Sequence, residues 1–152
     1  MRKNHQRHGV DMFYKPLLLP LLAQVLLTFT VWVYLYVRRL LEIRHKGIHP
    51  QALQDRSVSQ AIFSDSAGPS NNLQNLFEMP LLFYVAVLLS LTLMVQDAML
   101  VRLAWGFVVL RTLHSIVHCS YNRVMHRFVA YAFSCLFLLF IWVRLASYIL
   151  VN

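Results

Sequence analysis

The chain has 152 residues, of which 59% are hydrophobic and 13% are charged, and its mean hydropathy is +0.56. A soluble domain of this length has too small a core to hide so much apolar surface, so the composition excludes a water-soluble protein and predicts one embedded in lipid. The formal net charge of +8 indicates anionic lipid headgroups, and no nucleic acid, as the partner, because cations commonly flank membrane spans.

Four apolar segments are each long enough to cross a bilayer as a helix, which takes roughly 20 residues. They cover residues 17–37, 73–95, 99–119 and 128–151 of a single membrane domain, 1–152. The first segment is too long for the apolar part of a signal peptide and lacks a small-residue cleavage site, so we expect it to stay as a helix. The sequence therefore predicts an all-α integral membrane protein with four spans.

The connections between the spans predict how the helices pack. Residues 40–72 form a stretch of soluble composition, in which Gly47 and His49-Pro50 are expected to break the first helix. The second and third connections are only a few residues long, so consecutive helices must run antiparallel and lie side by side. An up-down-up-down four-helix bundle is the simplest architecture.

Lysines and arginines near the ends of the spans set the orientation of the chain in the membrane. Seven of them in the first and third connections outnumber five on the side of the two termini, which favours cytoplasmic first and third loops. The seven are Arg38, Arg39, Arg44, Lys46, Arg56, Arg123 and Arg127, and the five are Arg2, Lys3, Arg7, Lys15 and Arg102. We expect Arg102 and Arg144 only to anchor their helices, and Cys119 and Cys135 to be free packing thiols.

Polar residues gather at one end of the spans, on the side of the first and third connections. On the second span they recur at i, i+4 and i+7, and on the third at i, i+3, i+4, i+7 and i+11, so each set forms a stripe on one helix face. The direction of the chain brings the stripes to the same depth. The residues are Asn71, Asn75 and Glu78; Arg111, His114, Ser115, His118 and Asn122; Arg38 and Arg39; and Arg127, Tyr131 and Ser134.

Ionisable side chains at this depth are costly and usually face a bundle interior or a water-filled cavity. We expect Glu78 to form an ion pair with Arg111, because an unpaired carboxylate inside a span costs several kcal/mol. Such a pair by itself only locks two helices together, but the surplus of cations and imidazoles favours a pocket for an anionic ligand. A metal site at His114 and His118 is the weaker alternative, since no second acidic ligand accompanies them.

Three motifs together resemble a known family. Asn75-Leu-Phe-Glu78-Met-Pro80 in the second span is followed by Arg111-Thr-Leu-His114 in the third and by Arg127 with Tyr131 at the start of the fourth. This series resembles the MAPEG proteins, the membrane-associated proteins in eicosanoid and glutathione metabolism, over all four spans, and is most similar to their bacterial members. The resemblance implies a homotrimer in a bacterial inner membrane that binds glutathione between neighbouring subunits near the cytoplasmic side.

The resemblance also implies roles for single residues. Arg127 matches the catalytic arginine of the family, which stabilises the thiolate. The role is chemically reasonable, because lowering the pKa of a thiol from about 8.5 requires a nearby cation or strong donor. Glu78 matches the residue that meets the amine of glutathione. The remaining positions implied to bind this cofactor are Arg38, Asn75, Arg111, His114, His118 and Tyr131.

The chain departs from the prostaglandin E synthase pattern of the family. Asn71 and Gln74 stand where that pattern has arginines, His118 replaces a tyrosine, and Phe128 replaces a serine. Losing two cations removes charge-assisted hydrogen bonds to glutathione, each worth roughly 1.5 to 3 kcal/mol. The favoured function is a glutathione-dependent transferase or peroxidase acting on lipophilic molecules from the bilayer. The alternative is a non-catalytic lipid-binding scaffold or an accessory subunit of a larger membrane complex.

Overall fold

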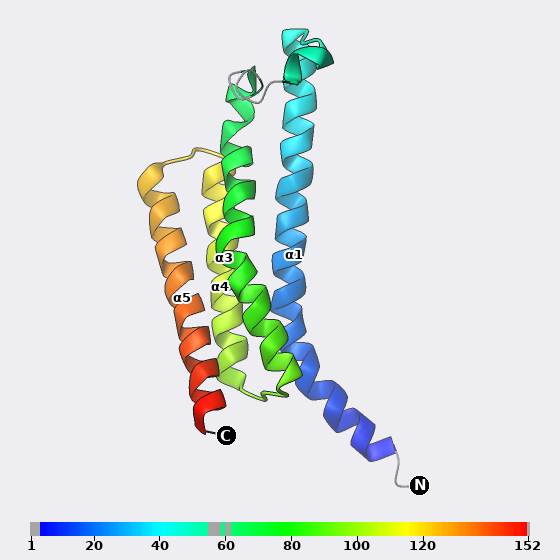
Figure 1. The fold of residues 1–152 in the computed structure, drawn as a ribbon, viewed down its shortest axis with the longest axis vertical. Coiled ribbons are helices and arrows are strands. Elements are labelled where there is room, and N and C mark those ends of the chain that lie inside the picture. The colour runs from blue at the N-terminus through cyan, green and yellow to red at the C-terminus, as the bar shows by residue number, and fades with distance from the viewer. Residues whose placement is uncertain (1–3, 55–58, 60–61, 152) are drawn as a thin grey trace.

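The structure is a computed structural model that describes residues 4–54, 59 and 62–151, with side chains described from residue 16 onward except at 50 and 52. Within these residues four long helices follow one another: α1 (Asn4–Lys46), α3 (Ala67–Thr92), α4 (Ala98–Cys119) and α5 (Val124–Val151) (Figure 1). The short 3₁₀ helices η1 (Pro50–Leu53) and η2 (Ser64–Ser66) lie between α1 and α3. Each long helix contains a segment long and apolar enough to span a membrane, which confirms the predicted all-α fold.

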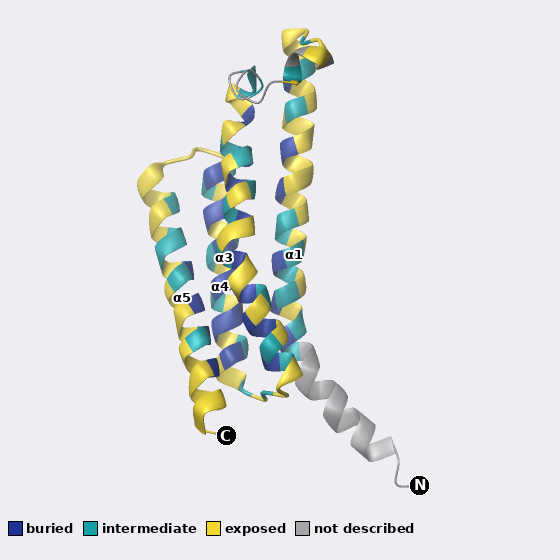
Figure 2. Ribbon diagram, viewed as in Figure 1, coloured by how far each residue is buried: buried dark blue, intermediate teal, exposed yellow. Residues whose placement is uncertain are grey.

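The helices form an elongated bundle with α1 at one edge, α5 at the other, and α3 and α4 between them (Figure 1). The most extensive contact is between α4 and α5, where a Cβ atom on Gly106 would overlap the ring of Phe137. At the centre, Phe83 of α3 stacks on Phe107 of α4 with the ring centroids 4.6 Å apart. Many large apolar side chains of the four long helices are exposed, as expected for helix faces in contact with lipid (Figure 2).

The chain leaves α1, α3 and α4 through residues in the left-handed backbone region. These are Gly47, Met94 and Asn122, with φ angles of 59°, 54° and 48°. At Gly47 this conformation lets the Ile48 N–H donate to the Ile43 carbonyl at 3.2 Å, which satisfies one of the free carbonyls at the end of α1. The predicted break of the first helix at Gly47 is therefore confirmed.

The first connection is shorter than predicted. The sequence predicts a soluble stretch over residues 40–72, but α1 continues to Lys46 and α3 already begins at Ala67. A polar composition marks where a helix leaves the lipid, and a helix can continue beyond that level when other contacts stabilise it, as α1 does up to the predicted break and α3 does from Ala67. α5 likewise begins at Val124, before the apolar segment at residue 128.

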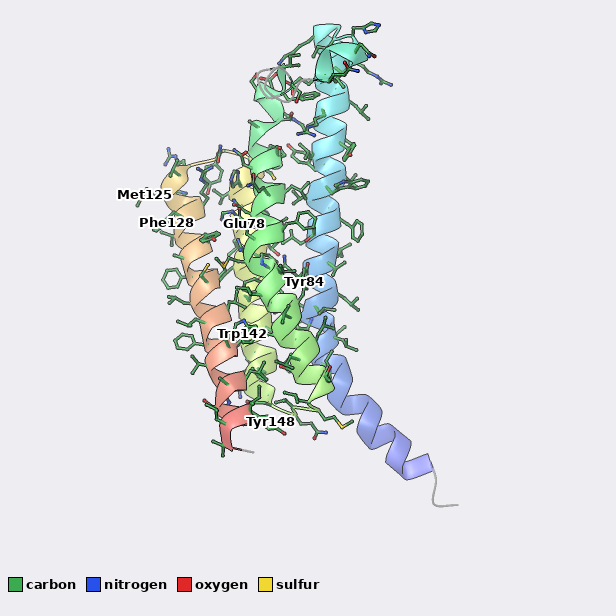
Figure 3. The ribbon with its side chains drawn as sticks, viewed as in Figure 1. Glu78, Tyr84, Met125, Phe128, Trp142 and Tyr148 are labelled. Carbon is green, nitrogen blue, oxygen red and sulfur yellow. The ribbon has the colours of Figure 1, made fainter. Side chains whose placement is uncertain are left out.

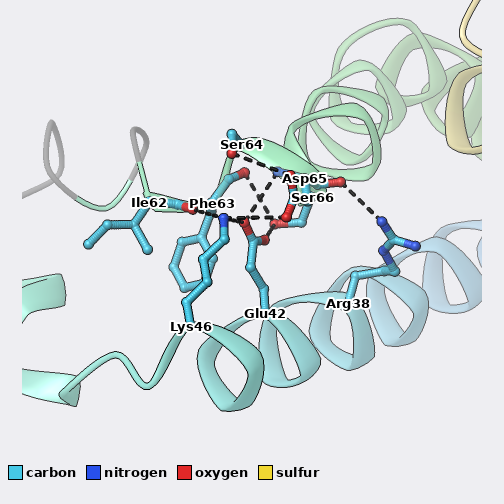
Figure 4. A network of polar contacts seen from close by, with 8 residues as sticks. All are labelled: Arg38, Glu42, Lys46, Ile62, Phe63, Ser64, Asp65 and Ser66. Carbon is cyan, nitrogen blue, oxygen red and sulfur yellow. Dashed lines mark hydrogen bonds and ion pairs between the residues drawn. The ribbon is translucent and has the colours of Figure 1, made fainter.

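The contacts that stabilise the extended ends of α1 and α3 centre on Glu42 (Figure 4). The buried Glu42 carboxylate accepts hydrogen bonds from Lys46 Nζ at 2.5 Å, from the Asp65 N–H at 3.2 Å and from the Ser66 hydroxyl at 3.0 Å. Lys46 also donates to the Ile62 carbonyl at 2.9 Å. Because hydrogen bonds to charged groups are the strong ones, this cluster holds the start of α3 against α1. Glu42 was given no role from the sequence.

At the opposite end of the bundle, Arg144 of α5 is bonded to the connection between α3 and α4. Its Nε donates to Asp97 Oδ2 at 2.6 Å, while Asp97 Oδ1 accepts a hydrogen bond from the Met99 N–H at 2.8 Å. Asp97 therefore caps the N-terminus of α4 and also ties it to α5. The expectation that Arg144 serves only as an anchor is wrong, because the turn carries a carboxylate within its reach.

Replacing Asp97 with asparagine should flatten the acid side of the stability profile. Burial alone raises the pKa of Asp97, but hydrogen bonds from Arg144 and the backbone outweigh it, so the pKa lies below its ordinary value of 3.8. A lowered carboxyl pKa stabilises the fold above the unfolded value, and this contribution is lost as the pH falls through the folded value. Wild-type protein in detergent should therefore lose Tm as the pH falls below 3.8.

The Asp97→Asn protein keeps a capping oxygen and should lose less Tm over the same acid range. The Asp97→Ala protein also lacks the cap and should be about 1 kcal/mol less stable at neutral pH. If Asp97→Asn and wild type had the same acid profile, the carboxylate would not contribute in the way described.

Candidate functional site

A polar pocket of about 320 Å³ opens between α3, α4 and α5, near the turn that joins α4 to α5. Its walls combine six polar side chains with two apolar ones: Asn71 and Asn75 from α3, His114 and His118 from α4, and Val124, Arg127, Phe128 and Tyr131 from α5. Phe128 is 60% exposed and, like Met125, projects outward from the first turns of α5 (Figure 3). The apolar wall of the pocket is therefore open to lipid.

Arg127 is held by the end of α4. Its Nη1 donates to Asn122 Oδ1 at 2.8 Å and lies 3.3 Å from Nε2 of His118. Because a guanidinium can only donate, Nε2 of His118 is the acceptor, and this neutral imidazole carries its proton on Nδ1. The backbone carbonyl of Arg127 accepts a hydrogen bond from Nδ1 of His114 at 2.9 Å. Both the side chain and the backbone of Arg127 are thus bonded to α4 and its turn.

His114 has one ring nitrogen without a partner in the described part of the chain. Since Nδ1 donates to the Arg127 carbonyl, Nε2 of the neutral ring is an acceptor, and it is buried without a hydrogen bond. The His114 ring centroid lies 5.4 Å from that of His118 and 5.8 Å from that of Tyr131. A buried acceptor without a partner in a pocket wall suits a donor group on a ligand.

Arg111 lies next to the pocket without lining it. Its side chain is 0% exposed, and no residue that the structure describes forms a hydrogen bond with its guanidinium nitrogens. The guanidinium carbon instead lies 4.7 Å from the ring centroid of Tyr131 and 5.6 Å from that of Phe107. These cation–π contacts recover part of the desolvation cost, but the guanidinium has no ion-pair partner within 4.0 Å among the described residues.

The expected ion pair between Glu78 and Arg111 is not formed in the described structure. Glu78 is exposed, and within the described ranges it has no ion pair within 4.0 Å. The reason is the rotation of α3 about its axis. The buried positions of α3 recur every three or four residues and include Pro69, Asn72, Leu76, Pro80 and Phe83. Glu78 lies midway between Leu76 and Pro80 in the sequence and therefore on the opposite face of the helix.

Arg38 also lies outside the pocket. Its Nη2 donates to the Asp65 carbonyl at 3.3 Å, and its side chain lines a separate cavity of about 300 Å³ between α1 and η2. Arg39 is similarly engaged, because its Nη2 donates to the Ser70 hydroxyl at 3.2 Å. Five of the predicted site residues line this pocket, namely Asn75, His114, His118, Arg127 and Tyr131. The other three, Arg38, Glu78 and Arg111, lie outside it in the described structure.

Two asparagines that were not selected as site residues organise the pocket. Asn72 is fully buried, donates to Cys119 Sγ at 3.4 Å and accepts a hydrogen bond from the Ser115 hydroxyl at 3.3 Å, so it joins α3 to α4. Asn122 orients Arg127. The role of Asn72 could have been predicted from the sequence, because Asn72 lies on the same face of α3 as Pro69 and Pro80, which are also buried. Asn122 carries none beyond its place in the polar stripe, because its role depends on the conformation of the turn.

A metal centre gains no support from these side chains. Among the described residues, no group of three or more His, Cys, Asp or Glu side chains is arranged to hold a metal ion. Nε2 of His118 already accepts a hydrogen bond from Arg127. Cys119 and Cys135 are both free, as predicted.

Comparison with known proteins identifies the family of the chain. The family model described as the MAPEG family matches residues 17–147, a range that contains the pocket and the three motifs. No match was found among curated proteins or among solved structures. Since the match covers most of the chain and all four membrane-spanning helices, this protein belongs to the MAPEG family.

Proposed function

We propose that this MAPEG protein is a glutathione-dependent transferase or peroxidase for lipophilic substrates, with Arg127 as the catalytic residue. The observation that carries the proposal is the Arg127 guanidinium, which Asn122 and His118 orient at a polar pocket with an apolar wall open to lipid. Among the described residues only Nη1 of this guanidinium is hydrogen-bonded, so Nε and Nη2 are available to a ligand. Bound glutathione would supply a thiol as nucleophile or reductant.

Arg127 would favour the ionised form of that thiol. A free thiol has a pKa of about 8.5, and an adjacent cation lowers it because it stabilises the negative sulfur. Arg127 cannot itself accept the proton, since a guanidinium stays protonated in proteins, so the proton of the thiol would leave to the solvent. In a transferase reaction Arg127 would hold the sulfur while it bonds to an electrophilic carbon and the leaving group departs with its electron pair.

The other walls of the pocket suit the rest of the two ligands. The amides of Asn71 and Asn75 and the free acceptor of His114 can hydrogen-bond a peptide. Val124 and Phe128 offer apolar surface to a substrate arriving from the bilayer. Glu78 and Arg38 lie outside this pocket, so the proposal includes a homotrimer in which they reach glutathione at a boundary between subunits.

A glutathione titration in detergent tests the proposed function. A thiolate absorbs ultraviolet light that the thiol does not, so the wild-type protein should gain absorbance at neutral pH until glutathione saturates the site. S-methylglutathione, which has no ionisable thiol, should bind without this signal. The protein should also conjugate glutathione to a chloronitrobenzene, with release of chloride, or reduce a lipophilic hydroperoxide.

The absence of both thiolate and turnover would instead favour the lipid-binding scaffold. That alternative draws on the neutral, exposed side chains of Asn71 and Gln74 on α3. It also draws on Arg127 being the one lysine or arginine among the described residues that line the pocket. A scaffold should gain Tm from a lipophilic ligand in the absence of glutathione.

A further inference from the structure

The turn between α4 and α5 contains a residue with two separate constraints. The backbone of Asn122 is in the left-handed region with φ of 48°, and its N–H donates to the Val117 carbonyl at 2.8 Å, which closes the end of α4. Few side chains adopt this conformation readily; glycine, asparagine and aspartate are the common ones. The position is thus restricted by the backbone before its side chain is considered.

The side chain of Asn122 adds the second constraint. Its Oδ1 accepts a hydrogen bond from Arg127 Nη1 at 2.8 Å, shorter than the 3.3 Å between the same nitrogen and Nε2 of His118. Glycine would supply the backbone conformation without the acceptor. Aspartate would supply both but would pair its negative charge with Arg127. Asparagine alone among the three provides an acceptor that leaves the charge of the guanidinium available.

We infer that Asn122 is the positioning residue for Arg127: its left-handed turn and neutral amide orient the guanidinium toward the thiol of the ligand without neutralising it. The inference rests on the proposed function for its chemical consequence, although the orientation of Arg127 can be measured without any ligand. The groups that face Arg127 from the neighbouring elements are His114 and His118 of α4 and Tyr131 of α5.

The test compares Asn122→Gly with Asn122→Asp in the full-length protein in detergent. Glycine keeps the turn, since it adopts positive φ without strain, but it releases Arg127. The pH at which conjugation reaches half its maximum should therefore rise, and kcat/KM should fall about tenfold, as expected for one lost hydrogen bond to a charged group. Asn122→Asp should also raise that pH, because the carboxylate competes with the thiolate for Arg127.

A second measurement separates the two variants and does not need glutathione. Modification of Arg127 by phenylglyoxal, followed by peptide mass spectrometry, should be faster than wild type in Asn122→Gly and slower in Asn122→Asp. Ser120→Gly is the matched control, because Ser120 lies in the same turn and bonds only within α4 in the described structure. It should leave both the pH profile and the labelling of Arg127 unchanged.

The outcomes distinguish the inference from the proposed function. A wild-type protein without a thiolate signal overturns the proposed function, while the opposite labelling of the two variants would still support Asn122 as the residue that positions Arg127. Equal labelling of wild type, Asn122→Gly and Asn122→Asp overturns the inference. So does a normal thiolate signal in wild type together with an unchanged pH profile in Asn122→Gly.

Discussion

Replacing Arg127 with alanine should abolish the thiolate signal of bound glutathione and lower kcat/KM for conjugation about 100-fold or more, the usual loss when one group that stabilises developing charge is removed. Arg127 is the one arginine or lysine that the structure places in the walls of the pocket. Without it, the described residues that line the pocket include no lysine or arginine, so the pKa of the thiol should return toward that of free glutathione. Titration of the ultraviolet signal against pH measures this shift directly.

Two further substitutions make the Arg127 result specific. Arg127→Lys keeps the charge but loses the planar fork that Asn122 and His118 orient, so it should retain only part of the activity. Arg123→Ala removes an exposed arginine from the same turn, for which the described structure has no side-chain hydrogen bond or ion pair, and should behave like wild type. A thiolate signal that survives in Arg127→Ala but disappears in Arg123→Ala would contradict the prediction, because it would show that Arg123 supplies the catalytic charge.

The general position of the pocket follows from the sequence, because it depends only on the length of the apolar segments and of the connections between them. Apolar length identifies the four spans, and short connections make consecutive helices antiparallel. The polar end of each span must then meet the polar end of the next. This is sufficient to bring Asn75 of α3, His114 of α4 and Arg127 of α5 to one edge of the bundle.

The rotation of each helix about its own axis does not follow from the sequence in the same way. In water, the apolar face of a helix is the face that packs, but in lipid both faces are apolar. Leu76 is buried and Phe77 is 66% exposed, although both are large and hydrophobic. The polarity of Asn71, Asn75 and Glu78 therefore predicts that their stripe faces the interior. The fully buried side chain is instead that of Asn72, while Asn71 and Asn75 line the open pocket and Glu78 is exposed. Small and polar residues are the better guide to packing in a membrane.

Replacing Arg111 with methionine should raise the stability of the ligand-free protein and remove its stabilisation by glutathione. The Arg111 guanidinium is 0% exposed and has neither a hydrogen bond nor an ion pair within 4.0 Å in the described structure. Burying a charge costs several kcal/mol, and each of the two cation–π contacts returns only part of it, roughly 2 kcal/mol. Methionine has a similar length and no charge, so Arg111→Met should gain about 1 to 3 kcal/mol, observed as a rise in Tm of several degrees.

Arg111→Lys is the matched control for this prediction, because it keeps the charge but replaces the guanidinium with an ammonium that is more strongly hydrated. It should be less stable than wild type, so the order of Tm should be methionine, arginine, lysine. If Arg111→Met were less stable than wild type, the guanidinium would have a counter-ion in the assembled protein, and the exposed Glu78 carboxylate would be the first group to test.

If the predicted order holds, the fold keeps a cation that it would be more stable without. A buried cation that lowers stability is best explained by a ligand whose negative charge completes the site. Glutathione should then raise the Tm of wild type but not that of Arg111→Met, and the two curves should approach each other as glutathione is added. Binding of the ligand would then offset the destabilisation that the buried Arg111 causes in the ligand-free protein. The function of the buried charge would be to bind an anionic ligand.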